Sequence, residues 1–217
     1  MQSLHSDVIK LITGYLDDCS KAVLSITCKK MHTVVLIPYI SVNDFHYSAI
    51  QSGHLTYVKW THSRFQTHFA HAKNGNTSAA LRHACAYGQI HIAEWLLSRL
   101  LSMGCELDVY FARSAAYGGH LDMLKWLREV NCPFEDRIHR DVADGGHLDM
   151  LKWLGEVGFK CDSWTYVYAI SSGHLHVMKW LKEIGCPYDI RARLCAMNSK
   201  RPEIVQWAWE NMPPQVD

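Results

Sequence analysis

One short segment recurs along the chain, and this recurrence limits the chain to folds built from repeated units. Three nearly identical copies, such as GHLDMLKWLRE at residues 119–129, begin 27 residues apart. A fixed period between about 20 and 50 residues is typical of solenoids and repeat arrays. Six copies align by their first residue, which is Gly53, Gly88, Gly119, Gly146, Gly173 or Lys200.

A tryptophan stands seven residues after the first residue of every copy. These residues are Trp60, Trp95, Trp126, Trp153, Trp180 and Trp207. Buried apolar surface stabilises a fold by about 25 cal/mol per Å², so large aromatic rings contribute strongly to a core. We therefore expect the six indole rings to dominate the packing energy of successive repeats.

Each copy has the pattern of a helix-turn-helix repeat. Leu121, Leu124 and Leu127 fall on one face of a helix of about ten residues. The residue four positions before each copy is always Ala or Val, and such small side chains let a preceding helix approach closely. The glycine between the two helices permits a tight reversal. Such helix pairs stack on their neighbours, which predicts an all-α solenoid of about 27-residue repeats.

The segment AAYGGHLDMLKWL at residues 115–127 resembles the ankyrin repeat, whose core reads A-A-x-x-G-H-L-x-V-V-x-x-L. The resemblance covers roughly residues 41–212. The repeat is shorter than the usual ankyrin unit of about 33 residues, and the T-P-L-H segment is missing, so we expect no full β-hairpin finger. Short tryptophan-containing repeats of this kind are similar to the ankyrin-like arrays of large DNA viruses of amoebae and of some protists.

The first forty residues do not follow the repeat pattern. An apolar stripe over residues 7–16 and a second apolar stretch through Leu24 and Cys28 predict a small helical unit. This segment resembles an F-box, although His5 replaces the usual proline. The residues at matching positions are Leu4, Asp7, Val8, Ile12, Tyr15, Leu16, Asp17, Leu24, Cys28 and Lys29.

The F-box resemblance implies docking to the Skp adaptor subunit of a cullin–RING ubiquitin ligase. The implied contact residues are Leu4, Val8, Ile12 and Leu16. The alternative is that these helices only cap the first repeat, since the ends of a solenoid need covers. We therefore expect an F-box-like segment at residues 1–40 and a repeat array at residues 41–217.

Composition excludes several functional classes. The chain has 22 Lys and Arg against 21 Asp and Glu, and this balance disfavours binding to nucleic acid. No run of 18 apolar residues is present, so we expect no membrane span. Met1–Lys10 lacks the pattern of a secretory signal. We expect a cytoplasmic or nuclear protein, in the host cytoplasm if it is viral.

Histidines recur with the repeat, but their spacing does not predict a metal or catalytic site. His54, His120, His147 and His174 should lie about 10 Å apart, too far to share a metal ion, so we expect them to hydrogen-bond the turns. His68 and His71 could touch one ion if helical, but no cysteine or acid stands at a ligand spacing. The chain contains no nucleophile elbow, P-loop or paired-carboxylate pattern, so we expect no catalytic, cofactor or metal site.

Four cysteines lie near the ends of the repeats. They are Cys105, Cys132, Cys161 and Cys186. A disulfide requires Cα atoms within about 7 Å, and stacked repeats should hold equivalent residues farther apart. We therefore expect small buried thiols.

The first helix of each repeat and the loop before it vary between copies. In ankyrin-like arrays these positions form the concave surface. Tyr, Trp and Arg are the residues that most often anchor protein interfaces. The alternative is that they are ordinary solvated positions. The predicted protein-binding residues are Tyr110, Arg113, Arg137, Arg140, Trp164, Tyr168 and Arg191.

Two functional hypotheses follow from this pattern. In the first, the chain is an adaptor that recruits an unidentified target protein to a Skp/cullin–RING ligase. In the second, it is a binding scaffold that sequesters a protein and has no link to a ligase. An enzyme would need a convergent polar pocket, which the repeat register does not predict.

Overall fold

The computed structural model describes residues 42–64 and 75–213, and every regular element in this part of the chain is an α-helix. The predicted F-box-like contact residues Leu4, Val8, Ile12 and Leu16 lie outside the described residues, as do His68 and His71. The helices are α3 (Val42–Gln51), α4 (Leu55–Arg64), α6 (Gly75–Ala86), α7 (Ile90–Ser102), α8 (Val109–Gly118), α9 (Leu121–Glu129), α10 (Ile138–Gly145), α11 (Leu148–Glu156), α12 (Ser163–Ser172), α13 (Leu175–Glu183), α14 (Ile190–Met197) and α15 (Pro202–Asn211).

The chain divides into two compact units, and each is described by itself. The described residues of the N-terminal unit are 42–64, 75–84 and 91–105. Those of the C-terminal unit are 85–90 and 106–213, which include helices α8 to α15.

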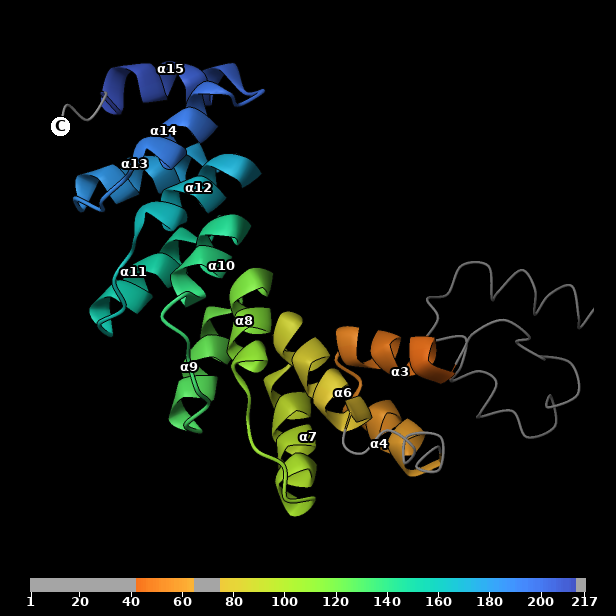
Figure 1. Cartoon of the computed structure of the whole chain (residues 1–217). Coiled ribbons are helices and arrows are strands. Elements are labelled where there is room, and N and C mark those ends of the chain that lie inside the picture. Colours follow the sequence, from red (N-terminus) through yellow and green to blue (C-terminus); the bar gives the residue numbers. More distant parts are fainter. Residues whose placement is uncertain (1–41, 65–74, 214–217) are drawn as a thin grey trace, which may run out of the picture. The chain divides into compact units, whose positions relative to one another are not determined.

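The helices of the C-terminal unit form stacked pairs, as the repeat pattern predicts (Figure 1). The first helices stack in chain order, with α10 against α8 and α12, and α12 against α14. Each second helix packs on the first helix of its own pair, as α9 does on α8 and α11 does on α10. Because the first helices adjoin one another, a residue at one repeat position lies next to the same position in the neighbouring repeats.

Glycine at the turn is required for two reasons. Gly119, Gly146 and Gly173 are left-handed, with φ of 77°, 75° and 86°. A Cβ at Gly119 would also overlap the imidazole ring of His147, which belongs to the following repeat. His120, His147 and His174 thus occupy the space beside Gly88, Gly119 and Gly146 of the preceding repeat.

Small and aliphatic side chains form the core of the C-terminal unit. Ala115 and Ala116 are fully buried, so the small residues before the turn allow the close helix approach that the sequence predicts. In α9, Met123, Leu124 and Leu127 are buried.

The repeat tryptophans do not dominate this core. The described ones are only half-buried: Trp95, Trp126, Trp153, Trp180 and Trp207. Trp126 is partly exposed, whereas Met123, Leu124 and Leu127 on the same helix are buried. The fully buried centre of the unit is therefore formed by aliphatic side chains, and the indole rings lie at its margin.

The N-terminal unit buries histidine as well as aliphatic side chains. Ala49, Ile50 and Val58 are fully buried there. His46 and His62 are buried with them, and their ring centroids lie 6.4 Å apart.

Candidate functional site

The seven residues predicted to bind protein all lie on the first helices of the C-terminal unit or next to them, and we call them the variable face. Four of them share one repeat position, nine residues before the turn residue: Tyr110, Arg137, Trp164 and Arg191. This position is exposed in all four repeats, with Tyr110 51% and Trp164 37% exposed. Because consecutive first helices are packed together, the four side chains form a row along the unit.

A second position of the variable face carries arginines that bind acids across helices. Arg113 and Arg140 both lie six residues before the turn residue of their repeat. From α8, Arg113 donates hydrogen bonds of 2.7 and 3.1 Å to the carboxylate of Asp141 on α10. These bonds join two adjacent repeats and orient the Arg113 guanidinium.

Trp164 lies between two arginines. The guanidinium carbon of Arg191 is 4.7 Å from the centroid of its ring, and that of Arg140 is 5.9 Å from it. Tyr168 lies one helical turn further along α12, with its ring centroid 6.4 Å from that of Trp164. The structure thus brings four of the seven predicted residues into one cluster of aromatic and guanidinium groups.

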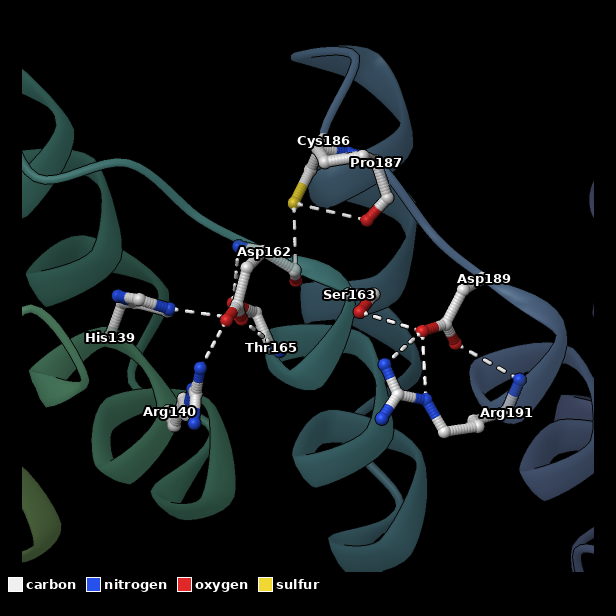
Figure 2. A network of polar contacts seen from close by, with 9 residues as sticks. All are labelled: His139, Arg140, Asp162, Ser163, Thr165, Cys186, Pro187, Asp189 and Arg191. Atoms are coloured by element: carbon white, nitrogen blue, oxygen red, sulfur yellow. Dashed lines mark hydrogen bonds and ion pairs between the residues drawn. The ribbon is translucent and has the colours of Figure 1, made fainter.

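Asp162 orients one of these arginines, as Figure 2 shows. It caps α12 by accepting a hydrogen bond from the Thr165 backbone N–H at 3.1 Å, and the Thr165 hydroxyl accepts one from the Asp162 N–H. The same carboxylate accepts hydrogen bonds from the Arg140 guanidinium and, at 3.1 Å, from Nε2 of His139. Burial alone would raise the pKa of Asp162, but the hydrogen bonds from Arg140 and His139 outweigh it and lower that pKa.

Asp189 orients the other arginine in the same way (Figure 2). It caps α14 by accepting hydrogen bonds from the backbone N–H groups of Arg191 and Ala192, at 2.9 and 3.1 Å. Its carboxylate also accepts bonds of 2.6 and 2.9 Å from the Arg191 guanidinium and one of 3.0 Å from the Ser163 hydroxyl. The hydrogen bond from Arg191 is the main cause that lowers the pKa of Asp189 to about 2. The arginines on both sides of Trp164 are therefore positioned by helix-capping acids.

The sequence analysis missed these acids, although they follow the repeat. An acid stands eleven residues before the turn residue in four successive repeats: Asp108, Glu135, Asp162 and Asp189. It also missed Leu194, which occupies the position of Arg113 and Arg140 in the last repeat and is half exposed. The repeat register alone would have found both.

A cavity of about 690 Å³ adjoins the variable face. Its basic lining residues are Arg128, Arg137, His139, Arg140 and Lys160, and its acidic ones are Asp136 and Asp162. Val157, Gly158, Phe159 and Cys161 complete the lining. Arg137 and Arg140 belong to both the cavity and the variable face, so the two are continuous.

Two of the four recurring histidines, His147 and His174, hydrogen-bond turns as expected, but the turns belong to the preceding repeat. Nε2 of His147 donates to the carbonyl of Tyr117 at 3.1 Å, and Nε2 of His174 donates to that of Asp144 at 2.9 Å. Within the described ranges, no group of three or more His, Cys, Asp or Glu side chains is placed to hold a metal ion.

The expectation that all four repeat-end cysteines are free thiols is wrong for one pair. Cys161 and Cys186 form a disulfide, with their Cα atoms 6.0 Å apart. The spacing argument holds for equivalent positions, but Cys161 precedes α12 whereas Cys186 follows α13, and the loops containing them meet. Cys132 is a buried free thiol, and burial raises its pKa to about 11.

Among the helices that the structure describes, none combines the length and apolar character needed to cross a membrane.

No protein-family model matches the chain, and no curated protein matches it. Among solved structures, the chain is similar to the human ASB11 ankyrin repeat domain, with a TM-score of 0.54 and 17% sequence identity. The match covers 90% of this chain and 93% of that one. The fold is therefore that of an ankyrin-repeat α-solenoid.

Proposed function

We propose that the chain is a non-catalytic, protein-binding scaffold whose variable face holds a target protein. The observation that carries this proposal is the exposed Trp164 ring between the guanidinium groups of Arg140 and Arg191. Tryptophan and arginine are the residues most enriched among the few that dominate binding energy at protein interfaces.

The fixed geometry of the cluster supports this function. Asp162 and Asp189 hold the two guanidinium groups in place before any partner arrives. A side chain that is already ordered loses less conformational entropy when it binds, so more of its interaction energy appears as affinity. The repeats supply this order through their backbone caps, while the residues on the face differ from one repeat to the next.

Substitution of Trp164 tests the scaffold proposal, and Trp209 provides the matched control. Trp209 is 67% exposed on α15 and also lies near an arginine, Arg193, but it is outside the variable face. We expect Trp164→Ala to weaken binding of a purified, affinity-captured target by about thirtyfold and Trp209→Ala to have little effect. Equal binding by the wild type and the Trp164→Ala variant would contradict the proposal.

We also propose that residues 1–40 connect the scaffold to a Skp-type adaptor of a cullin–RING ubiquitin ligase in the cytoplasm or nucleus. This part of the proposal is supported by the F-box resemblance of the sequence. The chain would then bring its target close to the ligase, and the partner enzymes would carry out the chemistry.

Co-purification with the Skp subunit tests the ligase link separately from target binding. We expect Leu4→Asp with Ile12→Asp to abolish capture of the Skp subunit and to leave target binding intact. If the wild-type chain does not capture Skp, the ligase link is wrong, and the function that remains is a scaffold that sequesters its target.

A further inference from the structure

We propose that the cavity beside the variable face binds an acidic segment of the target protein, with carboxylate side chains entering it. This inference rests on the proposed scaffold function and names the chemistry of the partner. The cavity is lined by Arg128 near the end of α9, by Asp136, Arg137, His139 and Arg140 around the start of α10, and by the loop 157–162 before α12.

The cavity contains more positive than negative charge. Its formal charges are those of Arg128, Arg137, Arg140 and Lys160 against those of Asp136 and Asp162. Arg140 is paired with Asp162. Arg128, Arg137 and Lys160 form no ion pair with any residue that the structure describes. Three unpaired cations against the single carboxylate of Asp136 therefore favour an anionic ligand.

Two buried polar atoms on the lining residues lack a partner in the described part of the chain. They are Nδ1 of His139, whose side chain is only 6% exposed, and Nε of Arg140. Because Nε2 of His139 donates to Asp162, Nδ1 of a neutral ring is an acceptor, whereas Nε of Arg140 is a donor. A peptide offers both complementary groups, an amide N–H and a carboxylate oxygen, whereas a halide or sulfate ion offers acceptors only.

The size and position of the cavity favour a peptide segment. A volume of about 690 Å³ lies within the range of cavities that hold whole ligands. Val157 and Phe159 supply apolar surface for the methylene groups of acidic side chains. Because Arg137 and Arg140 belong to both surfaces, a segment that crosses the variable face at Trp164 can continue into the cavity.

The test uses fluorescein-labelled peptides and fluorescence anisotropy on the full chain. The acidic probe is Gly-Asp-Glu-Asp-Glu-Gly, and the neutral probe of the same shape is Gly-Asn-Gln-Asn-Gln-Gly. The cavity variant is Arg128→Ala with Lys160→Ala, since both residues are exposed and lie outside the variable face. The matched control is Lys152→Ala with Lys179→Ala, which removes the same charge from the exposed sides of α11 and α13.

We expect the affinity of the acidic peptide for the lysine control to lie within about twofold of its affinity for the wild type. We expect the cavity variant to bind the same peptide about tenfold more weakly than the wild type does. We expect the neutral peptide not to bind. The inference is overturned if the acidic peptide fails to bind the wild type, or if the two double variants lose affinity equally. Competition by inorganic phosphate as strong as that by the peptide would also overturn it, because a simple anion would then suffice.

The two proposals fail in different ways. In one outcome, Trp164→Ala loses target binding and the acidic peptide does not bind the cavity. This outcome would leave the scaffold proposal intact and refute the proposal that the cavity binds an acidic segment. Peptide binding at the cavity together with an unaffected Trp164→Ala variant would identify an anion site and refute the proposed use of the variable face.

Discussion

The two units of the chain accommodate their polar side chains by different chemistry. In the C-terminal unit, the buried His139 donates to the carboxylate of Asp162, and His147 and His174 donate to turn carbonyls of the preceding repeat. In the N-terminal unit, His46 and His62 are instead packed close together in the interior.

The spacing of the copies does not explain this difference. The last repeats are 27 residues apart, but equivalent side chains do not always meet equivalent partners, since Arg113 binds Asp141 whereas Arg140 binds Asp162. The first interval, between Gly53 and Gly88, is 35 residues, yet Nε2 of His91 donates to the Gly53 carbonyl at 3.0 Å across it, as Nε2 of His176 does to the Gly146 carbonyl at 2.9 Å. The contact of a histidine with the preceding turn therefore occurs in both units and tolerates a longer interval.

Glycine-to-alanine substitutions should give the largest contrast between the units. Gly119 and Gly104 have similar left-handed φ angles of 77° and 72°, but only Gly119 has a side chain, that of His147, where a Cβ would lie. We expect Gly119→Ala to cost about 4 kcal/mol and Gly104→Ala about 1 kcal/mol, since overpacking adds to backbone strain only at Gly119. Urea unfolding followed by hydrogen exchange within each unit measures both.

A double variant checks the cause of the Gly119 effect. Adding His147→Ala to Gly119→Ala removes the ring that the new Cβ meets, so we expect the double variant to recover part of the lost stability. Equal costs for Gly119→Ala and Gly104→Ala would show that the contact between repeats adds nothing.

Mild acid should destabilise the N-terminal unit before it destabilises the C-terminal unit. Burial and the neighbouring His62 and His83 lower the pKa of His46 from 6.5 to about 4. The unfolded chain therefore binds this proton more readily, so the contribution of His46 is full above pH 6.5 and is lost as the pH falls toward 4. The loss amounts to about 3 kcal/mol.

The C-terminal unit should respond only in stronger acid. The pKa values of Asp162 and Asp189 are lowered from 3.8, so the stability that these carboxylates provide is present above that pH and is lost below it. Hydrogen exchange at pH 7, 5 and 4.5, corrected for intrinsic rates, should show α3 and α4 losing protection before α12 and α14. Simultaneous loss in both units would refute the distinction.

The smallest expected effect compares two capping acids within the C-terminal unit. Asp108 only caps α8, whereas Asp162 caps α12 and also binds Arg140 and His139. We expect Asp108→Ala to cost about 1 kcal/mol and Asp162→Ala about 2 kcal/mol, because the second change also leaves two polar partners unpaired. Urea denaturation measures both, and equal costs would mean that the ion pairs add no stability.

The sequence predicts the fold well because its strongest signals are local and periodic. Glycine at the turn predicts a left-handed reversal and alanine before it a close helix approach, and the structure shows these at Gly119 and Ala115. The role of Trp126 is harder to predict. Apolar residues cover a broad arc of the second helix, and periodicity does not indicate which of them lies at the centre of that arc.

The sequence predicts which residues form the variable face but not how their side chains are arranged. Variation between copies selects Trp164 and Arg191, and the structure brings them together. The capping acids lie outside the conserved-looking eleven-residue segment, so their pairing with Arg140 and Arg191 becomes visible only once adjacent repeats are packed. The disulfide between Cys161 and Cys186 was missed for the same reason, since it joins positions that are not equivalent in the repeat.

The most direct test of the central claim is hydrogen-exchange footprinting of the full chain with and without its purified target. The account predicts new protection in α12 and α14 and in the loops before them, where Trp164 and Arg191 lie, with no change on the exposed sides of α11 and α13. Protection confined to α11 and α13, or none in the C-terminal unit, would contradict it.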